Sequence, residues 1–269
     1  MGSTDLEIGL LGPVRLVAAL PERPLVSATQ RALVAALALA GGRITSYGQL
    51  IWAVWQEDAS NRRVHNLHFH MSKLRGQLRA IEPARPEPRI VTQPSGYRLD
   101  LAGSRADWQE FDRLTARARV LGRDGDLAAA GRLYQAALSQ WRGPALADVA
   151  AMSSWLGAQA ARLDEQRLMA FEEQAEVDLA VGRHREIVAD LAWLAQQHGP
   201  RQRLTSLLMI ALYRSGRQNE ALAAYASYRA ELAARFGLDP AAELKDLHRK
   251  ILASDPCLAT QTGVGPTSA

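Results

Sequence analysis

The stretch SNRRVHNLHFHMSKLRGQLRA, residues 60–80, decides how the first part of the chain folds. Its apolar residues recur at steps of three and four, the spacing of one face of an α-helix; they are Val64, Leu67, Met71, Leu74 and Leu78. Most of the residues between them are polar or basic. The pattern predicts an amphipathic helix from about Ser60 to Ala80 that packs one stripe on a core and leaves its other face in solvent.

The segments on either side of this helix predict a small domain of helices and strands. A helix is expected over residues 29–40, and a Ser-x-x-Gln capping box at Ser46 starts a second helix. Residues 6–26 alternate in hydropathy and are broken by prolines, as in two or three short strands. Residues 90–99 place the turn Gln-Pro-Ser-Gly between two apolar segments, which is typical of a β-hairpin. Together these elements predict a winged helix-turn-helix.

The rest of the chain is predicted to be helical throughout, with internal repeats. Val181-Gly182-Arg183-His184 recurs 34 residues later as Ser215-Gly216-Arg217-Gln218, which is the tetratricopeptide period. Ala221 and Tyr225, after the second copy, match the small and aromatic positions of that repeat. The turn over residues 122–126 resembles a more diverged copy. These features predict stacked helical pairs.

The predicted fold class is therefore mostly α, with an N-terminal winged helix-turn-helix (α+β) followed by an all-α, tetratricopeptide-like domain. We expect the winged helix over residues 1–101 and the helical domain over 102–254. Residues 255–269 are rich in Gly, Pro, Thr and Ser, and we expect a disordered tail there. The join at 101–106 is short, so the two domains are expected to pack on each other.

The net charge of +4 lies entirely in the first hundred residues. These hold 12 Lys and Arg against 8 Asp and Glu, and the remaining residues hold 20 of each kind. Between residues 59 and 81 there are five basic residues and no acidic one. A local positive field of this kind suits a polyanion, because binding phosphates releases condensed counterions.

The face of the 60–80 helix opposite the apolar stripe carries the candidate DNA-binding residues. At 100° per residue they are Arg62, His65, Asn66, Phe69, Ser72 and Lys73, with His70 and Arg75 on the flanks. Their side chains supply the groups that read base edges and hold phosphates in a major groove. An outward Phe69 has no core to fill and is predicted to pack against a thymine methyl. A solvated charged face is the alternative, and the lack of acids and the following hairpin argue against it.

Metal and catalytic sites are not predicted. His65 and His68 are helical neighbours, but His70 points away from His68 and no nearby carboxylate completes a set of ligands. The sequence has no phosphate loop and no Gly-x-Ser-x-Gly elbow, and the single cysteine, Cys257, has no evident catalytic partner. We therefore expect a protein that is not an enzyme and has no cofactor. Its longest apolar run is too short to span a bilayer.

Several motifs resemble the Streptomyces antibiotic regulatory proteins (SARPs) over roughly residues 6–254. In the first domain these are Leu11-Gly12-Pro13-Val14, Gln30-Arg31-Ala32-Leu33, Leu50-Ile51 with Trp55, Ser72-Lys73-Leu74-Arg75 and Gly96-Tyr97-Arg98-Leu99. In the second they are Trp141-Arg142-Gly143-Pro144-Ala145-Leu146-Ala147-Asp148, Leu212-Tyr213-Arg214-Ser215-Gly216-Arg217-Gln218 with Glu220-Ala221-Leu222, and Gly237-Leu238-Asp239-Pro240 with Glu243-Leu244. SARPs of the small type join an OmpR-type winged helix to a bacterial transcriptional activator domain.

The resemblance implies a sequence-specific transcriptional activator. It would bind direct repeats in promoters of a specialised-metabolite (antibiotic) gene cluster, as a homodimer on double-stranded DNA, and recruit RNA polymerase holoenzyme with its sigma factor. Its expected location is the cytoplasm, at the nucleoid. The OmpR-type pattern places DNA contacts at His65, Phe69, His70, Ser72, Lys73 and Arg75, and at Gln93 in the wing, where arginine is common. The alternatives are a tetratricopeptide-type adaptor or a ligand-gated regulator, with a basic domain that localises it to DNA.

Overall fold

The structure is a computed structural model of the 269-residue chain, and it describes residues 6–17 and 27–258. The chain divides into two compact units. The first unit comprises residues 1–115 with 136–168, and the second comprises 116–135 with 169–269. The expectation of strands over 6–26 is met by two strands in the described part, and residues 18–26 lie outside it.

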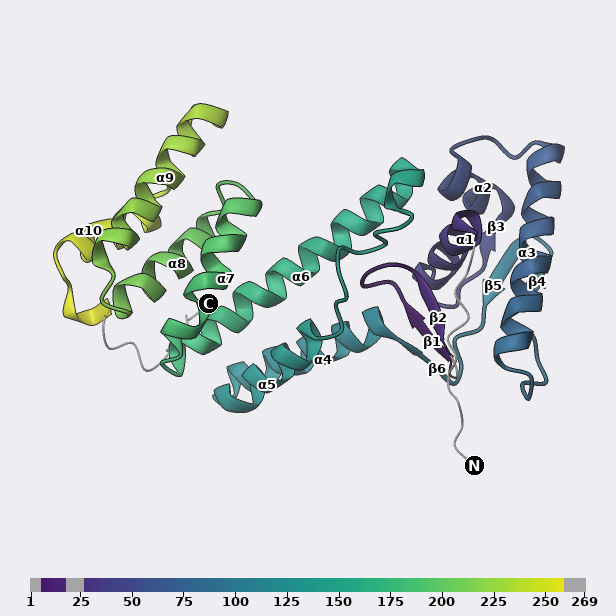
Figure 1. The fold of residues 1–269 in the computed structure, drawn as a ribbon, viewed down its shortest axis with the longest axis horizontal. Coiled ribbons are helices and arrows are strands. Elements are labelled where there is room, and N and C mark those ends of the chain that lie inside the picture. Colours follow the sequence, from purple (N-terminus) through teal and green to yellow (C-terminus); the bar gives the residue numbers. More distant parts are fainter. Residues whose placement is uncertain (1–5, 18–26, 259–269) are drawn as a thin grey trace. The chain divides into compact units, whose positions relative to one another are not determined.

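Within the described residues up to Ala106, three helices and two small sheets build the N-terminal part of the first unit (Figure 1). The helices are α1 (Ala28–Leu39), α2 (Tyr47–Trp55) and α3 (Asn61–Ile81). One sheet has the strand order β2-β1-β6, with β1 at Leu6–Gly9, β2 at Arg15–Val17 and β6 at Ser104–Ala106. The other has the order β3-β5-β4, with β3 at Thr45–Ser46, β4 at Ile90–Gln93 and β5 at Gly96–Leu99. The predicted winged helix-turn-helix is confirmed.

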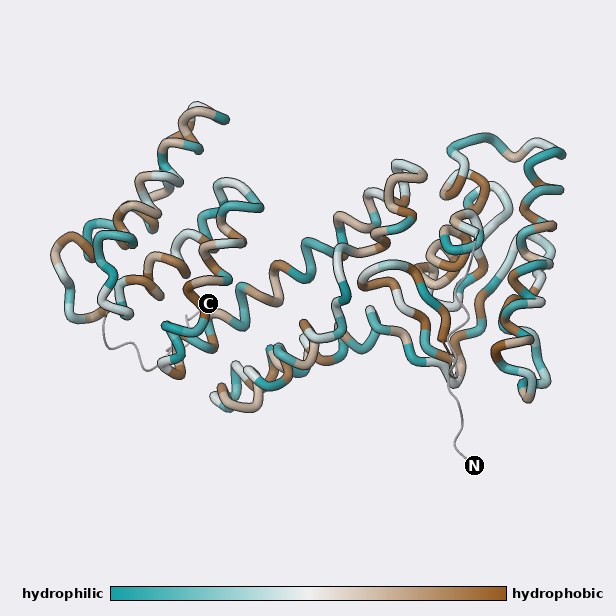
Figure 2. The backbone as a smooth tube through the Cα atoms, in the orientation of Figure 1, coloured by the Kyte–Doolittle hydropathy of each residue, from teal (hydrophilic) through white to brown (hydrophobic). Residues whose placement is uncertain are grey.

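The apolar stripe of α3 forms the core of this part, as its spacing predicts. Leu67, Met71 and Leu74 are fully buried, and α3 packs against α1 and α2. Hydrophilic and hydrophobic residues alternate along α3 (Figure 2). The capping box at Ser46 is present, because its hydroxyl accepts from the amide of Gln49 while the Gln49 side chain accepts from the Ser46 amide. The core therefore fixes which face of α3 is left outside.

Seven more α-helices follow among the residues described up to Leu258: α4 (Asp107–Arg123), α5 (Leu127–Leu138), α6 (Ser154–Ala180), α7 (His184–Gln197), α8 (Gln202–Arg214), α9 (Gln218–Phe236) and α10 (Ala242–Leu252). The helices α4, α5 and α6 have residues in both units. In the second unit α8 packs against both α7 and α9. The all-α fold predicted for the second part of the chain is confirmed.

The repeated turns of the second unit share one backbone geometry. Gly182 and Gly216 have φ angles of 85° and 76°, a region that favours glycine. At each turn the following amide reaches back five residues, from Arg183 to the Asp178 carbonyl and from Arg217 to the Leu212 carbonyl. Gly125, in the more diverged copy, has a φ of 87°. The repeat inferred from the 34-residue spacing is thus a repeated helix end.

Two segments differ from the expected pattern. Residues 139–153 are not continuously helical, since they contain only the 3₁₀ turn Ala150–Met152. Gly143 is followed by a proline, and Leu146 has a positive φ of 50°, so an α-helix cannot continue through this segment. At the expected join, β6 pairs in parallel with β1, with Ile8 opposite Ala106.

The segment around residues 141–149 is bonded to the N-terminal sheet within the first unit. The Asp107 carboxylate, 6% exposed, accepts from the amides of Leu10 (2.8 Å) and Leu11 (3.1 Å) and from the Arg142 guanidinium (3.0 Å). The Arg142 amide donates to the Leu11 carbonyl, and the Leu146 amide donates to the Leu10 carbonyl. The first residue of α4 and the loop after α5 therefore complete the packing around β1.

The start of the expected disordered tail is ordered. Pro256–Leu258 forms a 3₁₀ turn, and the Arg214 Nε donates to the Leu258 carbonyl at 2.9 Å. The local reason is that Arg214, at the end of α8, supplies a donor for this turn. Residues 259–269 lie outside the described residues.

Candidate nucleic-acid interface

The structure brings most of the candidate residues onto the solvent face of α3. Arg62, His65, Phe69, Ser72 and Lys73 are exposed, and Asn66, His70 and Arg75 are partly buried beside them. This placement follows from the buried stripe on the opposite side of the helix. The result is an exposed face with guanidinium, imidazole, hydroxyl, ammonium and aromatic groups. We call these eight residues the outer face of α3.

Phe69 and Lys73 form a pair on this face. The Phe69 ring is 50% exposed, and the Lys73 Nζ lies 4.4 Å from its centroid. The two residues are four apart on one helix, which places their side chains side by side. A cation over an exposed ring is stabilised by about 0.5–1 kcal/mol. The pair thus holds a positive charge and an apolar surface at one place on the outer face.

His70 lies at the edge of the outer face, between two aromatic rings. Its ring centroid is 6.1 Å from that of Trp55 and 5.5 Å from that of Phe69. Burial lowers the pKa of His70, and the positive charge of Lys73 lowers it further. The imidazole is therefore neutral at neutral pH. In a groove it would act as a hydrogen-bonding group and not as a cation.

Arg75 is turned toward the hairpin and not freely into solvent. Its Nε donates to the Ile90 carbonyl at 2.9 Å, and its terminal nitrogen donates to the Thr92 hydroxyl at 2.5 Å. The guanidinium also lies 5.4 Å from the Tyr97 ring centroid. These contacts tie α3 to the β4–β5 hairpin, the wing. Arg75 therefore holds the wing against α3, and its positive charge lies beside β4.

The wing is short and closely packed on the start of α2. Gln93 is partly buried, and its carbonyl accepts from the Tyr47 hydroxyl at 3.3 Å. The Tyr47 amide donates to the Ser95 carbonyl at 3.1 Å. A side chain at Gly96 would place its Cβ only 2.0 Å from the Thr45 carbonyl oxygen, so this position requires glycine. The close approach of β3 and β5 sets where the wing projects.

Two residues that the sequence reasoning did not select also belong to this region. His68 is exposed and packs edge-on against Tyr47 and Tyr97, at 5.5 and 6.2 Å between ring centroids. Its spacing of three from His65 is the sequence signal that places His68 near the outer face. Arg63 is ion-paired with Glu57, and its guanidinium lies 5.6 Å from the centroid of the Trp55 ring. Both contacts depend on the conformation of the loop between α2 and α3, which the sequence does not predict. Among the described residues no group of His, Cys, Asp or Glu is arranged to hold a metal ion.

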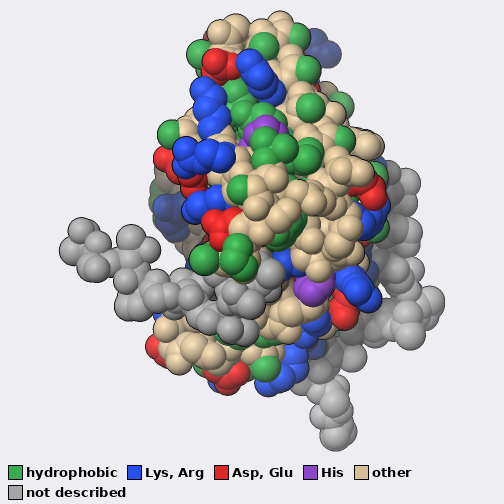
Figure 3. Space-filling view, turned by 90° about the vertical axis from the view of Figure 1, so that its left-hand side faces the viewer, with side chains coloured by type: hydrophobic (Ala, Val, Ile, Leu, Met, Phe, Trp, Pro, Cys, Tyr) green, Lys and Arg blue, Asp and Glu red, His purple; other side chains and the backbone are tan. Residues whose placement is uncertain are grey.

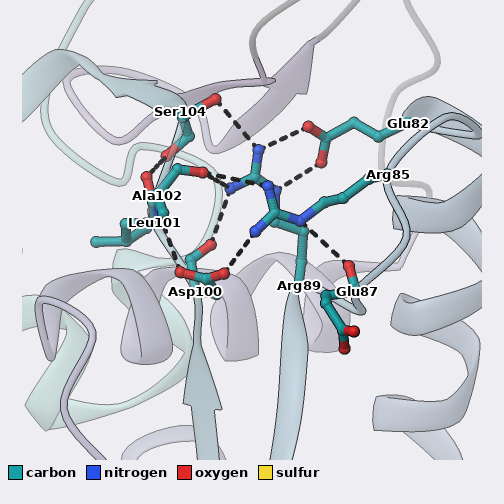
Figure 4. Close-up of polar contacts among 9 residues, drawn as sticks. Glu82, Arg85, Glu87, Arg89, Asp100, Leu101, Ala102 and Ser104 are labelled. Carbon is teal, nitrogen blue, oxygen red and sulfur yellow. Dashed lines mark hydrogen bonds and ion pairs between the residues drawn. The ribbon is translucent and has the colours of Figure 1, made fainter.

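A buried ionic cluster fixes the C-terminal end of α3 (Figure 4). Arg89, 3% exposed, donates to both carboxylate oxygens of Glu82, each at 2.6 Å, and to the Ala102 carbonyl at 2.6 Å. Arg85 donates to Asp100 at 2.5 Å. The Ala102 amide lowers the pKa of Asp100, and Arg85 adds to this effect. The cluster bonds the residue that ends α3 to the connection between β5 and β6.

Comparison with known proteins identifies both parts of the chain. Residues 22–99 match the family "Transcriptional regulatory protein, C terminal", and residues 106–252 match "Bacterial transcriptional activator domain". The regulatory protein DnrI of Streptomyces peucetius is 31% identical over 261 residues, which cover 93% of each chain. The chain belongs to the Streptomyces antibiotic regulatory protein (SARP) family. Its two parts are an OmpR-type winged helix and a bacterial transcriptional activator domain, the domain types of transcriptional regulators.

Other relatives of this SARP are longer. The regulatory protein AfsR of Streptomyces coelicolor is 38% identical over 258 residues, which are 96% of this chain and 25% of AfsR. The chain thus spans about a quarter of the length of AfsR. The solved structure of Mycobacterium tuberculosis EmbR in complex with a low affinity phosphopeptide is similar with a TM-score of 0.86 and 30% identity, over 96% of this chain and 69% of that one. Among the described residues, no helix has the length and apolar character needed to cross a membrane.

Proposed function

We propose that this SARP binds promoter DNA sequence-specifically through the outer face of α3 and the wing. The observation that carries the proposal is the exposed Phe69–Lys73 pair on a helix with no acidic residue. A helix face with this composition fits the major groove, where ammonium and guanidinium groups meet phosphates and guanine edges and an apolar group meets a thymine methyl. In this proposal the phosphates are contacted by Ser72, Lys73 and Arg75. The residues that lie in the groove are Arg62, His65, Asn66, Phe69 and His70. Gln93 lies at the wing.

The second part of the proposal concerns assembly on DNA. Residues 1–101 would supply the DNA-binding part, and two copies would bind head-to-tail as a homodimer at direct repeats. Each copy must meet the same face of the duplex, so the repeats are expected to start about 10–11 bp apart. Such promoters would control a specialised-metabolite gene cluster, and the protein would act in the cytoplasm, at the nucleoid.

The helical part, residues 102–254, is proposed to contact RNA polymerase holoenzyme, including its sigma factor. Stacked helical pairs offer broad faces for protein contacts. A groove of about 360 Å³ lies between α7, α8 and α9, lined by Leu208, Leu212 and Tyr228 among others. Basic side chains of this unit lie beside acidic ones, as in the pairs Arg217–Glu220 and Arg235–Glu231, and Figure 3 shows the two kinds interspersed at the α7–α10 end. This mixed charge suits a protein better than a polyanion.

Selection of DNA by the purified full-length chain tests the DNA-binding proposal. Fragments recovered from a random library should share a motif, and binding to the enriched duplex should exceed binding to a scrambled duplex of equal composition. The slope of log K against log salt should be steep, because phosphate contacts release counterions. Recovery of no shared motif would contradict the proposal and favour a protein-interaction adaptor.

Lys73→Ala tests the phosphate contact within the same assay. It should weaken binding to both duplexes and lower the salt slope by about one unit. Lys245→Ala removes an exposed lysine from α10 and is the matched control, which should leave the slope unchanged. A change in sequence preference with an unchanged slope would show that Lys73 reads a base instead.

A further inference from the structure

The end of α2 is bonded to the start of α6 inside the first unit. Ser153, 4% exposed, donates its hydroxyl proton to the Ala53 carbonyl in the last turn of α2. The same hydroxyl accepts from the Leu156 amide at 3.1 Å and so caps the N-terminus of α6. One side chain therefore satisfies a free carbonyl of one helix and a free amide of the other.

Gln56 makes the second contact between these helices. It ends α2 in the left-handed region, with a φ of 54°, which residues other than glycine adopt at a cost. Its Oε1 accepts from the Ser154 amide at 3.1 Å and from the Ser154 hydroxyl at 2.6 Å. A strained, exposed glutamine thus holds the first residue of α6. Strained positions of this kind persist where the surrounding structure determines them.

The loop after Gln56 leads directly into α3. Glu57 pairs with Arg63, in the first turn of α3, and the Arg63 guanidinium lies over the Trp55 ring at 5.6 Å. The Ser60 hydroxyl accepts from the Arg63 amide at 3.3 Å and caps the helix. Glu57 directly follows Gln56 in the chain, and its ion pair with Arg63, together with the Ser60 cap, bonds this loop to the N-terminal turn of α3.

We propose that Gln56 is a positioning residue for DNA binding. By holding the loop of residues 56–60 against Ser154, it sets where α3 begins, and so sets the affinity of the outer face for DNA without touching DNA. The partner that it uses is the start of α6, so a residue outside the winged helix contributes to DNA recognition. This inference rests on the proposed function, in which α3 reads DNA.

Variants at Gln56 separate positioning from stability. Gln56→Gly removes the acceptor and also relieves the left-handed backbone, so its thermal unfolding midpoint should equal or exceed that of the wild type. Gln56→Asn tolerates the same backbone, but its side chain is one methylene too short to reach Ser154. Both full-length variants should bind the duplex selected by the wild type about tenfold more weakly. The salt slope should not change, because no phosphate contact is lost.

Further variants identify the contact and the kind of change. Gln56→Glu keeps an acceptor oxygen and should restore most of the affinity. Ser154→Ala should weaken binding as Gln56→Asn does, and combining it with Gln56→Gly should add little, because the two residues share one interaction. Ser254→Gly is the matched control, since Ser254 has a φ of 52° in the second unit and its change should leave DNA binding unaltered.

The outcomes are distinguishable. The positioning role would be overturned, and the proposed function left intact, if three variants bind the selected duplex as tightly as the wild type does. These variants are Gln56→Gly, Gln56→Asn and Ser154→Ala. A loss of affinity in step with a lowered unfolding midpoint in all three variants would show a stabilising contact only, and would also overturn it. A wild-type chain that selects no DNA sequence would overturn both proposals.

Discussion

At the scale of single residues, Phe69 is the side chain of the proposed DNA-binding face that best tests that proposal against a merely solvated face. Its ring is half exposed on a basic helix and is not part of the protein core. Phe69→Ala is expected to cost about 1–3 kcal/mol on the selected duplex, the scale of a lost base contact, and much less on scrambled DNA. Fluorescence anisotropy titrations measure both affinities. Phe236→Ala, which removes another exposed ring, should change neither. Equal losses on the two duplexes would show that Phe69 has a structural role.

His70 gives a prediction for pH. Burial, with the charge of Lys73, lowers the pKa of His70 in the folded chain, so the unfolded chain takes up its proton at a higher pH. This contribution to the free energy of unfolding is therefore fully present above the unfolded pKa of about 6.5, and it is lost as the pH falls through the lower folded value. Urea unfolding measured at about pH 7.5 and about pH 5.5 tests this. Between these two pH values the free energy of unfolding should fall more for the wild type than for His70→Gln. The exposed His65→Gln is the control and should behave as the wild type does. Equal losses in the wild type and His70→Gln would contradict the assignment.

At the scale of elements, the ionic cluster at the end of α3 is expected to be essential to the winged helix. Arg89→Met leaves the Glu82 carboxylate, only 11% exposed, without its bidentate partner. Removing one member of a buried pair costs about 3–5 kcal/mol. Denaturant unfolding should show this loss for Arg89→Met, and Arg105→Met, at an exposed position of β6, should show almost none. The double variant Arg89→Met/Glu82→Met should recover much of the stability; a double variant as unstable as the single one would show that the backbone contacts of Arg89 dominate.

The elements also show what periodicity predicts and what it cannot. The boundaries of α1 and α3 lie within one or two residues of the expected ones, because their apolar stripes and caps are local features of the sequence. The sequence does not predict the strand β6, since Ser-Arg-Ala has no strand pattern and is extended because it pairs with β1. In the candidate interface, the outer face of α3 follows from helical geometry. The bonds of Arg75 to β4 and of Arg63 to Glu57 depend on loop conformations and could not be predicted.

At the scale of the whole molecule, the activator part contributes to the structure of the winged helix. Asp107 and the segment around Arg142 supply partners for the backbone of Leu10 and Leu11. The Asp148 carboxylate also accepts from the Val14 amide at 2.9 Å. These bonds lie within the first unit, so the division of the chain by sequence family does not coincide with its division into compact units. The winged helix is therefore expected to need residues that follow it.

Fragments of two lengths test this dependence and the activation proposal together. A chain ending at residue 105 lacks Asp107 and loses several hydrogen bonds, each of which contributes about 0.5–1.5 kcal/mol. It should unfold at a lower denaturant concentration and bind the selected duplex more weakly than residues 1–168, which retain every part of the first unit.

The longer fragment lacks α7 to α10, so with purified polymerase it should bind the promoter but fail to stimulate transcription. If the 105-residue fragment matches the full chain in stability and affinity, the bonds from Asp107 and Arg142 contribute nothing to DNA binding. If residues 1–168 activate as the full chain does, the polymerase contact does not lie in α7 to α10.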